Sequence, residues 1–183
     1  MSTPSDVADF EPGQILRAFE ARRVEYVVIG AIAAIAAGAP ILTTELDVTP
    51  GRSPENLQRL ALALRDLDAK QRSVGSPEGV PFPIDAEMLG TADSWTLVTR
   101  AGNVDVMFTP AGTQGYGDLR RGAQRERIAG VTVTVASLAD VIRSKEAANR
   151  EKDSMYLPIL RRTLEETRER GRPPPRSGSD SLE

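Results

Sequence analysis

The chain has 183 residues, the length of one domain with a substantial core, and a weakly acidic formal charge of −3. It contains no cysteine and no histidine, which excludes disulfides, thiol catalysis, histidine general bases and metal sites built on Cys or His. The charge also argues against a protein that simply coats nucleic acid. Any catalysis must use carboxylates, lysines, arginines, hydroxyls or backbone groups.

The two ends of the chain differ from its middle. We expect a flexible lead over 1–10, a domain over 11–170 and a disordered tail over 171–183, where the sequence is GRPPPRSGSDSLE. The N-terminus carries acids instead of the basic region of a secretory signal, and the apolar run over 27–39 is too short to cross a bilayer. These features predict a cytoplasmic protein with no membrane partner.

Helical and extended patterns alternate along the first half of the domain. Gly30 ends the first buried strand, and Ser53 followed by Pro54 is typical of the start of a helix. The expected segments are a helix over 14–23, a strand over 25–29, an alanine-rich helix over 31–37, a strand over 46–49 and a helix over 54–68.

The second half continues the alternation and adds a hairpin. The expected segments are a loop over 73–84, strands over 95–99, 104–108 and 131–135, a helix over 137–149 capped by Ser137, and a last helix beginning at Pro158. The turn over 100–103 makes two of these strands antiparallel. We therefore expect an α/β (α+β) protein whose mixed β-sheet is flanked by helices.

The stretch YVVIGAIAAIAAGAPILTTELDVTP, residues 26–50, holds two acids on one expected strand. Glu45 and Asp47 are two residues apart, so their side chains point to the same face of that strand. Two carboxylates this close repel unless a cation lies between them, and Mg²⁺ carrying a nucleoside triphosphate is the candidate. The alternative is a pair of solvent-facing acids on an edge strand.

Asp105 is a third acid of interest, because it lies inside the apolar strand VDVMF. If this strand neighbours that of Glu45 and Asp47, three carboxylates converge and can hold Mg²⁺ beside an attacking hydroxyl. The alternative is an ordinary hairpin acid.

Small and hydroxyl residues flank the acidic pair. Gly30 lets the backbone approach a phosphate, and the helix that begins at Ala31 offers free N–H groups to it. Thr43 and Thr44 are candidates for contact with a phosphate or with metal-bound water. The alternatives are a glycine that merely ends a strand and two plain turn residues.

Charged residues in SKEAANREKD form a second cluster. Lys145 is a candidate for neutralising a triphosphate, and Asp153 for holding Lys145 or Arg150 in place. A solvated charged helix is the alternative. A separate run of arginines is either an RNA-backbone contact or ordinary surface; its members are Arg120, Arg121, Arg125 and Arg127.

Taken in order over about residues 14–165, these pieces resemble the minimal nucleotidyltransferases of the polymerase-beta-like superfamily, most closely the AbiEii/MenT-type toxins of toxin–antitoxin systems. The resemblance implies the nucleotidyltransferase fold and transfer of a nucleoside monophosphate from an NTP, with Mg²⁺, to an acceptor hydroxyl. In the toxin branch the acceptor is typically tRNA and a cognate antitoxin is a possible partner, whereas in other branches the acceptor is a protein or a small molecule. The resemblance assigns catalysis and metal binding to Glu45, Asp47 and Asp105, and nucleotide binding to Gly30, Ala31, Thr43, Thr44, Lys145, Arg150 and Asp153.

Three positions depart from the family pattern. Ala31 stands where the family has a second glycine or a serine, Glu45 where it has an aspartate, and Ile41-Leu42 where an arginine often precedes the threonine. Two alternatives therefore stay open. One is a weakened or inactive binding protein on the same fold, and the other is a kinase-like phosphotransferase that uses the same carboxylates.

Overall fold

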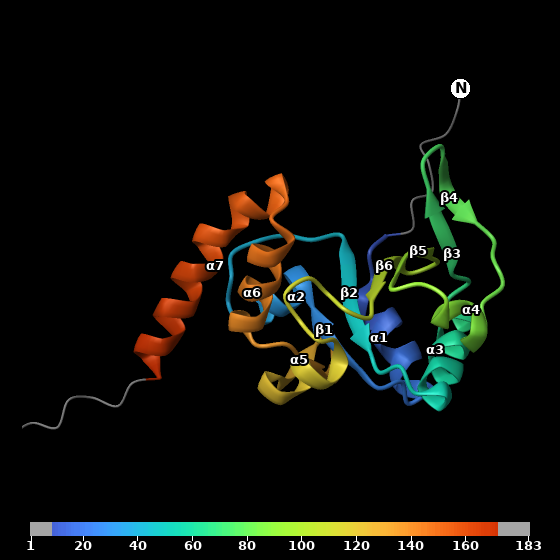
Figure 1. Cartoon of the computed structure of the whole chain (residues 1–183), viewed down its shortest axis with the longest axis horizontal. Coiled ribbons are helices and arrows are strands. Elements are labelled where there is room, and N and C mark those ends of the chain that lie inside the picture. The colour runs from blue at the N-terminus through green and yellow to red at the C-terminus, as the bar shows by residue number, and fades with distance from the viewer. Residues whose placement is uncertain (1–8, 172–183) are drawn as a thin grey trace, which may run out of the picture.

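The computed structural model describes residues 9–171, which form a mixed eight-stranded sheet with helices packed around it (Figure 1). The strand order is β4-β3-β5-β6-β2-β1-β8-β7. The strands are β1 Tyr26–Ile29, β2 Glu45–Pro50, β3 Lys70–Ser73, β4 Ser76–Val80, β5 Ser94–Thr99, β6 Gly102–Met107, β7 Gln124–Ile128 and β8 Val131–Val135. The helices are α1 Pro12–Ala21, α2 Gly30–Ala36, α3 Pro54–Asp66, α4 Ala86–Gly90, α5 Tyr116–Gly122, α6 Leu138–Ala148 and α7 Glu151–Arg170.

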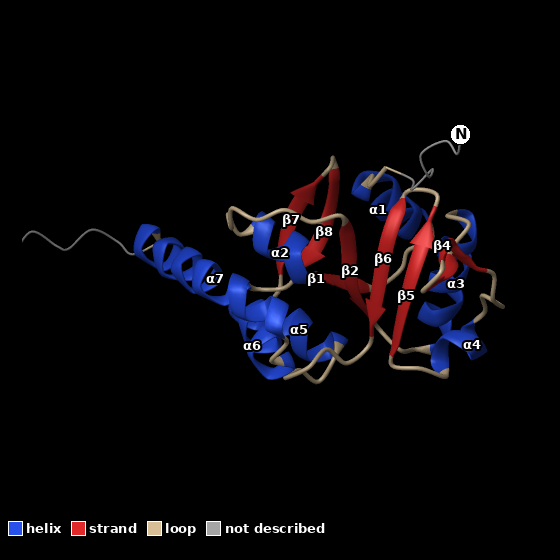
Figure 2. Cartoon of the chain, turned by 90° about the horizontal axis from the view of Figure 1, so that it is seen from above, coloured by secondary structure: helices blue, strands red, loops and turns tan. Residues whose placement is uncertain are grey.

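The helices gather in two groups on either side of the central strands. Figure 2 shows α3 and α4 near β3–β5, and α5, α6 and α7 toward the other side. Helix α7 packs on α6 and extends away from the body, while the β3–β4 hairpin projects at the opposite end (Figure 1). The centre of the sheet, strands β6 and β2, therefore lies between the two groups.

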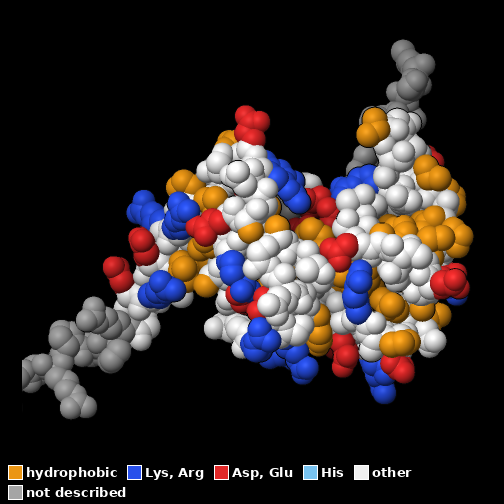
Figure 3. Space-filling view, viewed as in Figure 1, with side chains coloured by type: hydrophobic (Ala, Val, Ile, Leu, Met, Phe, Trp, Pro, Cys, Tyr) orange, Lys and Arg blue, Asp and Glu red, His pale blue; other side chains and the backbone are white. Residues whose placement is uncertain are grey.

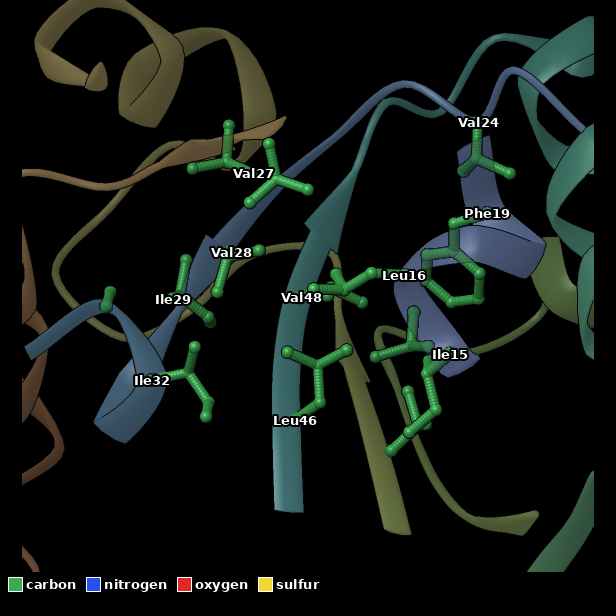
Figure 4. Packing of buried hydrophobic residues seen from close by; sticks show 14 of the residues in the cluster. Ile15, Leu16, Phe19, Val24, Val27, Val28, Ile29, Ile32, Leu46 and Val48 are labelled. Atoms are coloured by element: carbon green, nitrogen blue, oxygen red, sulfur yellow. The ribbon is translucent and has the colours of Figure 1, made fainter. Parts of the chain in front are cut away.

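Strand β2 has one buried and one half-buried face. Leu46 and Val48 are fully buried, while Glu45 and Asp47, which alternate with them, are only partly covered. Figure 4 shows Leu46 and Val48 on the side of the sheet where α1 lies. Strand β6 alternates in the same way. One face of the central strands is therefore core, and the opposite face is free to carry polar side chains.

Helix α1 covers the apolar face through residues at helical spacing. Ile15, Leu16 and Phe19 are fully buried, and the ring of Phe19 meets that of Tyr26 edge-on at a centroid distance of 5.2 Å. Burying a side chain of this size contributes about 1.5–3 kcal/mol. This packing holds β2 in place under the polar face.

The predicted fold class is confirmed, as are the expected helices and strands from residue 14 to residue 68, each to within a few residues. Ser53 caps α3 by accepting a hydrogen bond from the Asn56 backbone N–H, and Ser137 caps α6 in the same way through Asp140. The hairpin of β5 and β6 is also confirmed, with Thr99 paired to Gly102.

The expected loop over 73–84 is wrong, because residues 76–80 form strand β4 and pair with β3. The sequence KQRSVGSPEGV is polar and largely exposed, so it lacks the apolar alternation that marks a strand. Gly75 in the turn adopts a φ of 84°, a conformation that suits a tight hairpin. The consequence for the site is that this hairpin carries an arginine, Arg72, into it.

The expected start of the last helix at Pro158 is also wrong. Helix α7 begins at Glu151, and Pro158 lies within it. The proline removes a hydrogen bond to the carbonyl of Ser154, but Ser154 is exposed, so this loss costs less than it would at a buried position. The first turn is fastened to α6 by an ion pair between Asp153 and Lys145.

Strand β7, which the sequence did not suggest, pairs with β8 through a turn at Ala129-Gly130, both with positive φ. Arg125 and Arg127 are exposed on it, and contact of the arginine run with RNA stays a prediction. Within residues 9–171, no helix is both long and apolar enough to cross a membrane. The expected lead 1–10 and tail 171–183 lie largely outside the described residues.

Asn56 joins the start of β1 to the end of β2. Its side-chain amide donates to the carbonyls of Glu25 and Gly51, each at 2.8 Å, and its oxygen accepts from the Glu25 N–H at 2.7 Å. Because these groups are buried, we predict that Asn56→Ala lowers the free energy of unfolding by about 2–4 kcal/mol, measured by urea denaturation. Gln58→Ala, at an exposed position of the same helix, should cost less than about 0.5 kcal/mol. Equal effects would contradict this role.

Candidate active site

Three carboxylates meet on the polar face of the central strands. Strands β2 and β6 are parallel and pair Asp47 with Asp105, so these two side chains lie next to each other on one face. Glu45, two residues before Asp47, shares that face. One oxygen of each of the three carboxylates lies within 4.8 Å of the others. The cluster lies in a pocket of about 460 Å³.

Gly30 allows the chain to turn beside Asp47. Its φ is +64°, and the β1–β2 register places Ile29 opposite Asp47. A Cβ at position 30 would lie 2.8 Å from Cγ of Asp47 and closer still to its Oδ2. Only glycine therefore fits this turn without moving the carboxylate.

The cluster holds more negative charge than its surroundings balance. Burial, followed by the charges of Glu45 and Asp105, raises the pKa of Asp47 from 3.8 to about 7. Burial also raises the pKa of Asp105 to about 6, although Arg72 opposes that rise. Carboxylate oxygens that lie this close together are suitable ligands for Mg²⁺ or Mn²⁺. A bound ion would relieve the repulsion between the carboxylates.

The pocket brings together the other residues that the sequence predicted for nucleotide binding. It is lined, among others, by Gly30, Ala31, Thr43, Thr44, Lys145, Arg150 and Asp153. Lys145 Nζ lies 2.9 Å from Oδ1 of the buried Asp153, so Asp153 holds the lysine in place. The Thr43 hydroxyl donates a hydrogen bond to the backbone carbonyl of Glu45 and accepts one from its N–H, as side chains that stabilise a turn do. The proposed contacts of all these residues with nucleotide stay predictions.

Two cations near the cluster were missed by sequence reasoning. Arg72 donates to Glu45 through Nη1 at 3.3 Å and to Asp105 through Nη2. Lys152 lines the pocket, and its charge lowers the pKa of both Asp47 and Asp105. The signal for Arg72 would have been a hairpin at Val74-Gly75, but the polar flanks concealed it. Lys152 gave no signal that separated it from an ordinary surface lysine.

No protein-family model and no curated protein gives a significant match to the sequence. Several solved structures do match the fold, and three of them follow. A candidate nucleotidyltransferase from Thermotoga maritima is 16% identical, with a TM-score of 0.52 over 84% of this chain and 89% of its own. The lincosamide antibiotic adenylyltransferase LnuA, bound to lincomycin, is 13% identical, with a TM-score of 0.56 over 84% and 98%. ANT(2″)-Ia, bound to adenylyl-2″-tobramycin, is 15% identical, with a TM-score of 0.52 over 87% and 95%.

This chain has the nucleotidyltransferase fold. Because the sequence identities are this low, the structural matches establish only the arrangement of helices and strands. The chemistry must be argued from the residues of the site. On this nucleotidyltransferase fold, the carboxylates of β2 and β6 lie in one pocket with the turn at Gly30 and the basic residues of α6 and α7. The more specific toxin-type resemblance has no support from these structures.

We predict that Gly30→Ala destabilises the protein by more than the strain of a left-handed alanine alone, which is about 1–2 kcal/mol. The added methyl group would also displace Asp47 and weaken Mn²⁺ binding. Gly38→Ala is the matched control, because Gly38 has φ of +96° with open space around it. Urea denaturation and Mn²⁺ titration should separate the two variants, and equal losses would contradict the close approach to Asp47.

We further predict that the metal-free protein loses stability as pH rises from about 4 to about 7. A carboxyl group whose folded pKa is raised binds more protons in the folded state, so stability falls as pH rises through this window. At about 1.4 kcal/mol per pKa unit, Asp47 accounts for a few kcal/mol. Thermal melting at several pH values in the presence of a chelator should show that the stability of Asp47→Asn falls less steeply with pH than that of the wild type. Asp68→Asn, changed at an exposed position, should show the same fall as the wild type. A slope that Asp47→Asn leaves unchanged would contradict the assignment.

Proposed function

We propose that this protein is a nucleotidyltransferase that moves a nucleoside monophosphate from an NTP to an acceptor hydroxyl. The observation that carries the proposal is the convergence of Glu45, Asp47 and Asp105 within 4.8 Å, in a pocket of a nucleotidyltransferase fold. One of the similar structures, LnuA, is named an adenylyltransferase. Another, ANT(2″)-Ia, is bound to an adenylylated product. We propose that this chain also catalyses nucleotidyl transfer.

In this proposal, the three carboxylates hold Mg²⁺, which when bound would neutralise phosphate charge and favour attack on the α-phosphorus. Asp105 takes the proton of the attacking hydroxyl. In the metal-free site the pKa of Asp105 is about 6, so this carboxylate is ionised at neutral pH and able to accept a proton. The acceptor oxygen bonds to the α-phosphorus, and the bond from that phosphorus to the bridging oxygen breaks as pyrophosphate leaves.

The triphosphate lies on the α2 and α6 side of the cluster. Lys145, held by Asp153, and Arg150 supply positive charge there, and Lys152 adds to it. Gly30, Ala31, Thr43 and Thr44 also line this pocket, and the sequence resemblance assigns all four to nucleotide binding.

The acceptor is proposed from the sequence resemblance as tRNA, with the protein acting as the toxin of a toxin–antitoxin pair in the cytoplasm. The names of two similar structures instead point to small antibiotics as acceptors of those proteins. A transfer assay should therefore offer both kinds of acceptor.

The inactive alternative gains support from one observation. Glu45, which replaces the family's aspartate, is engaged by Arg72, so part of the cluster is already neutralised by the protein itself. A binding protein would retain the nucleotide pocket without transfer. Restoring the shorter side chain by Glu45→Asp tests this directly, since a large gain in rate would show that Glu45 limits catalysis.

We predict that purified protein with Mg²⁺ transfers label from an α-labelled NTP to total tRNA or to an antibiotic acceptor. Asp47→Asn and Asp105→Asn should each lower the rate by at least about 100-fold. Both changes relieve charge repulsion, so the variants should stay folded. Asp68→Asn, outside the pocket, should transfer normally.

Several outcomes would overturn the proposal. Transfer that survives in Asp47→Asn would exclude the carboxylate cluster as the catalytic site. Nucleotide binding without transfer to any acceptor would favour the binding protein, and transfer of a γ-label would indicate kinase chemistry.

A further inference from the structure

Arg72 contacts the carboxylate cluster from the side of the sheet opposite the phosphate-side cations. Strand β3 pairs with β5 through Lys70 with Val98 and Gln71 with Leu97, and Arg72 follows directly. On β5, Thr96 pairs with Asp105 of β6. Arg72 therefore reaches the carboxylates across β5 and approaches them from the β3–β4 hairpin.

The space-filling view shows how charged side chains are distributed on one face of the molecule (Figure 3). The molecule is hollowed between the side of α6 and α7 and the side of the β3–β4 hairpin (Figure 3). Acidic atoms lie in the hollow, with basic atoms on both of its rims. The lining residues of the pocket include Lys145, Arg150 and Lys152 from the α6–α7 side, while Arg72 contacts the acids from the other side.

One guanidinium bridges carboxylates of two different strands. Arg72 pairs with Glu45 of β2 and with Asp105 of β6, and its side chain is 33% exposed against 31% and 18% for its partners. Within residues 9–171, the ion pairs of the carboxylate cluster are both made by Arg72. The planar fork of an arginine suits such a two-partner contact, which a lysine cannot reproduce.

These contacts use the groups that a divalent cation would need. Glu45 and Asp105 are two of the three ligands available, and a guanidinium held against them places a positive charge where the ion must approach. The guanidinium and the ion cannot both lie against the same oxygens at short range, because like charges repel.

The same contacts tether the outer part of the hairpin. Strand β3 pairs with β5 only through Lys70 and Gln71, and Val74 at the tip of the hairpin is fully exposed. The base is packed, since a Cβ on Gly79 would lie 2.9 Å from Cβ of Lys70. Arg72 is therefore the point at which the outer hairpin is joined to the centre of the sheet.

We infer that Arg72 is an internal counter-ion of the carboxylate cluster, which a divalent cation displaces from Glu45 and Asp105, and that this displacement loosens the outer β3–β4 hairpin. Arg72 is thus a positioning residue: before the ion arrives, it holds the Glu45 and Asp105 carboxylates against one guanidinium. The inference rests on the metal site of the proposed function and adds a residue that opposes metal binding.

The first test measures Mn²⁺ affinity, by electron paramagnetic resonance of free Mn²⁺, in the full-length wild type and in variants. Arg72→Gln should bind Mn²⁺ at least about tenfold more tightly, because a competing positive charge has been removed. Arg72→Lys, which keeps the charge without the fork, should fall between the two. Arg22→Gln is the matched control, since Arg22 pairs with Asp66 at 2.6 Å outside the pocket and should leave the affinity unchanged.

The second test is hydrogen–deuterium exchange over residues 72–80. In the wild type, Mn²⁺ should increase exchange there, whereas Arg72→Gln should exchange quickly with and without the ion. Equal or weaker Mn²⁺ binding by Arg72→Gln would show that the arginine merely supports the ligands and would overturn the inference. So would an unchanged or slower exchange of the wild-type hairpin on Mn²⁺ binding.

The outcomes separate this inference from the proposed function. If neither the wild type nor Arg72→Gln binds Mn²⁺, the metal site fails and both proposals fall. If the wild type transfers nucleotide but Arg72→Gln binds Mn²⁺ no more tightly, only the role of Arg72 is overturned.

Discussion

The parallel pairing of β2 with β6 is the constraint on which the rest of the site depends. It sets Asp47 beside Asp105, while Leu46 and Val104 on the opposite face are committed to the core. A slip of one residue would turn the acids of β2 into the apolar layer under α1, at a prohibitive desolvation cost. The hydrophobic effect on one face thus fixes the position of the carboxylates on the other.

The site concentrates like charge that folding alone would disfavour. The raised pKa values of Asp47 and Asp105 show that the folded chain resists full ionisation of the cluster. Cations on both sides offset only part of the negative charge of the cluster. They are Lys145 and Lys152 toward α6 and α7, and Arg72 on β3. Such unresolved charge is typical of a site that awaits a cationic ligand, and it explains why a binding function fits this face better than a structural one.

The sequence predicted those features that depend on local pattern. Alternation showed that Glu45 and Asp47 share a face, and Ser53 with Pro54 marked the start of α3. The partnership of Asp105 with them could be stated only as a condition, because strand neighbours are set by packing across the whole sheet. Arg72 was beyond reach, since its edge hairpin is polar on both faces and carries no periodic signal. Pro158 gave the wrong start for α7, because a proline that usually opens a helix lies here within one, four residues after the exposed Ser154.

In the proposed function, Glu45, Asp47 and Asp105 bind one divalent cation together. A crystal structure of the protein with Mn²⁺ and a non-hydrolysable NTP, with the metal located by its anomalous scattering, tests this binding. We expect a single strong peak within coordination distance of oxygens from all three carboxylates, at about 2.0–2.2 Å. A metal bound elsewhere, or a bound nucleotide with no metal between these side chains, would contradict it.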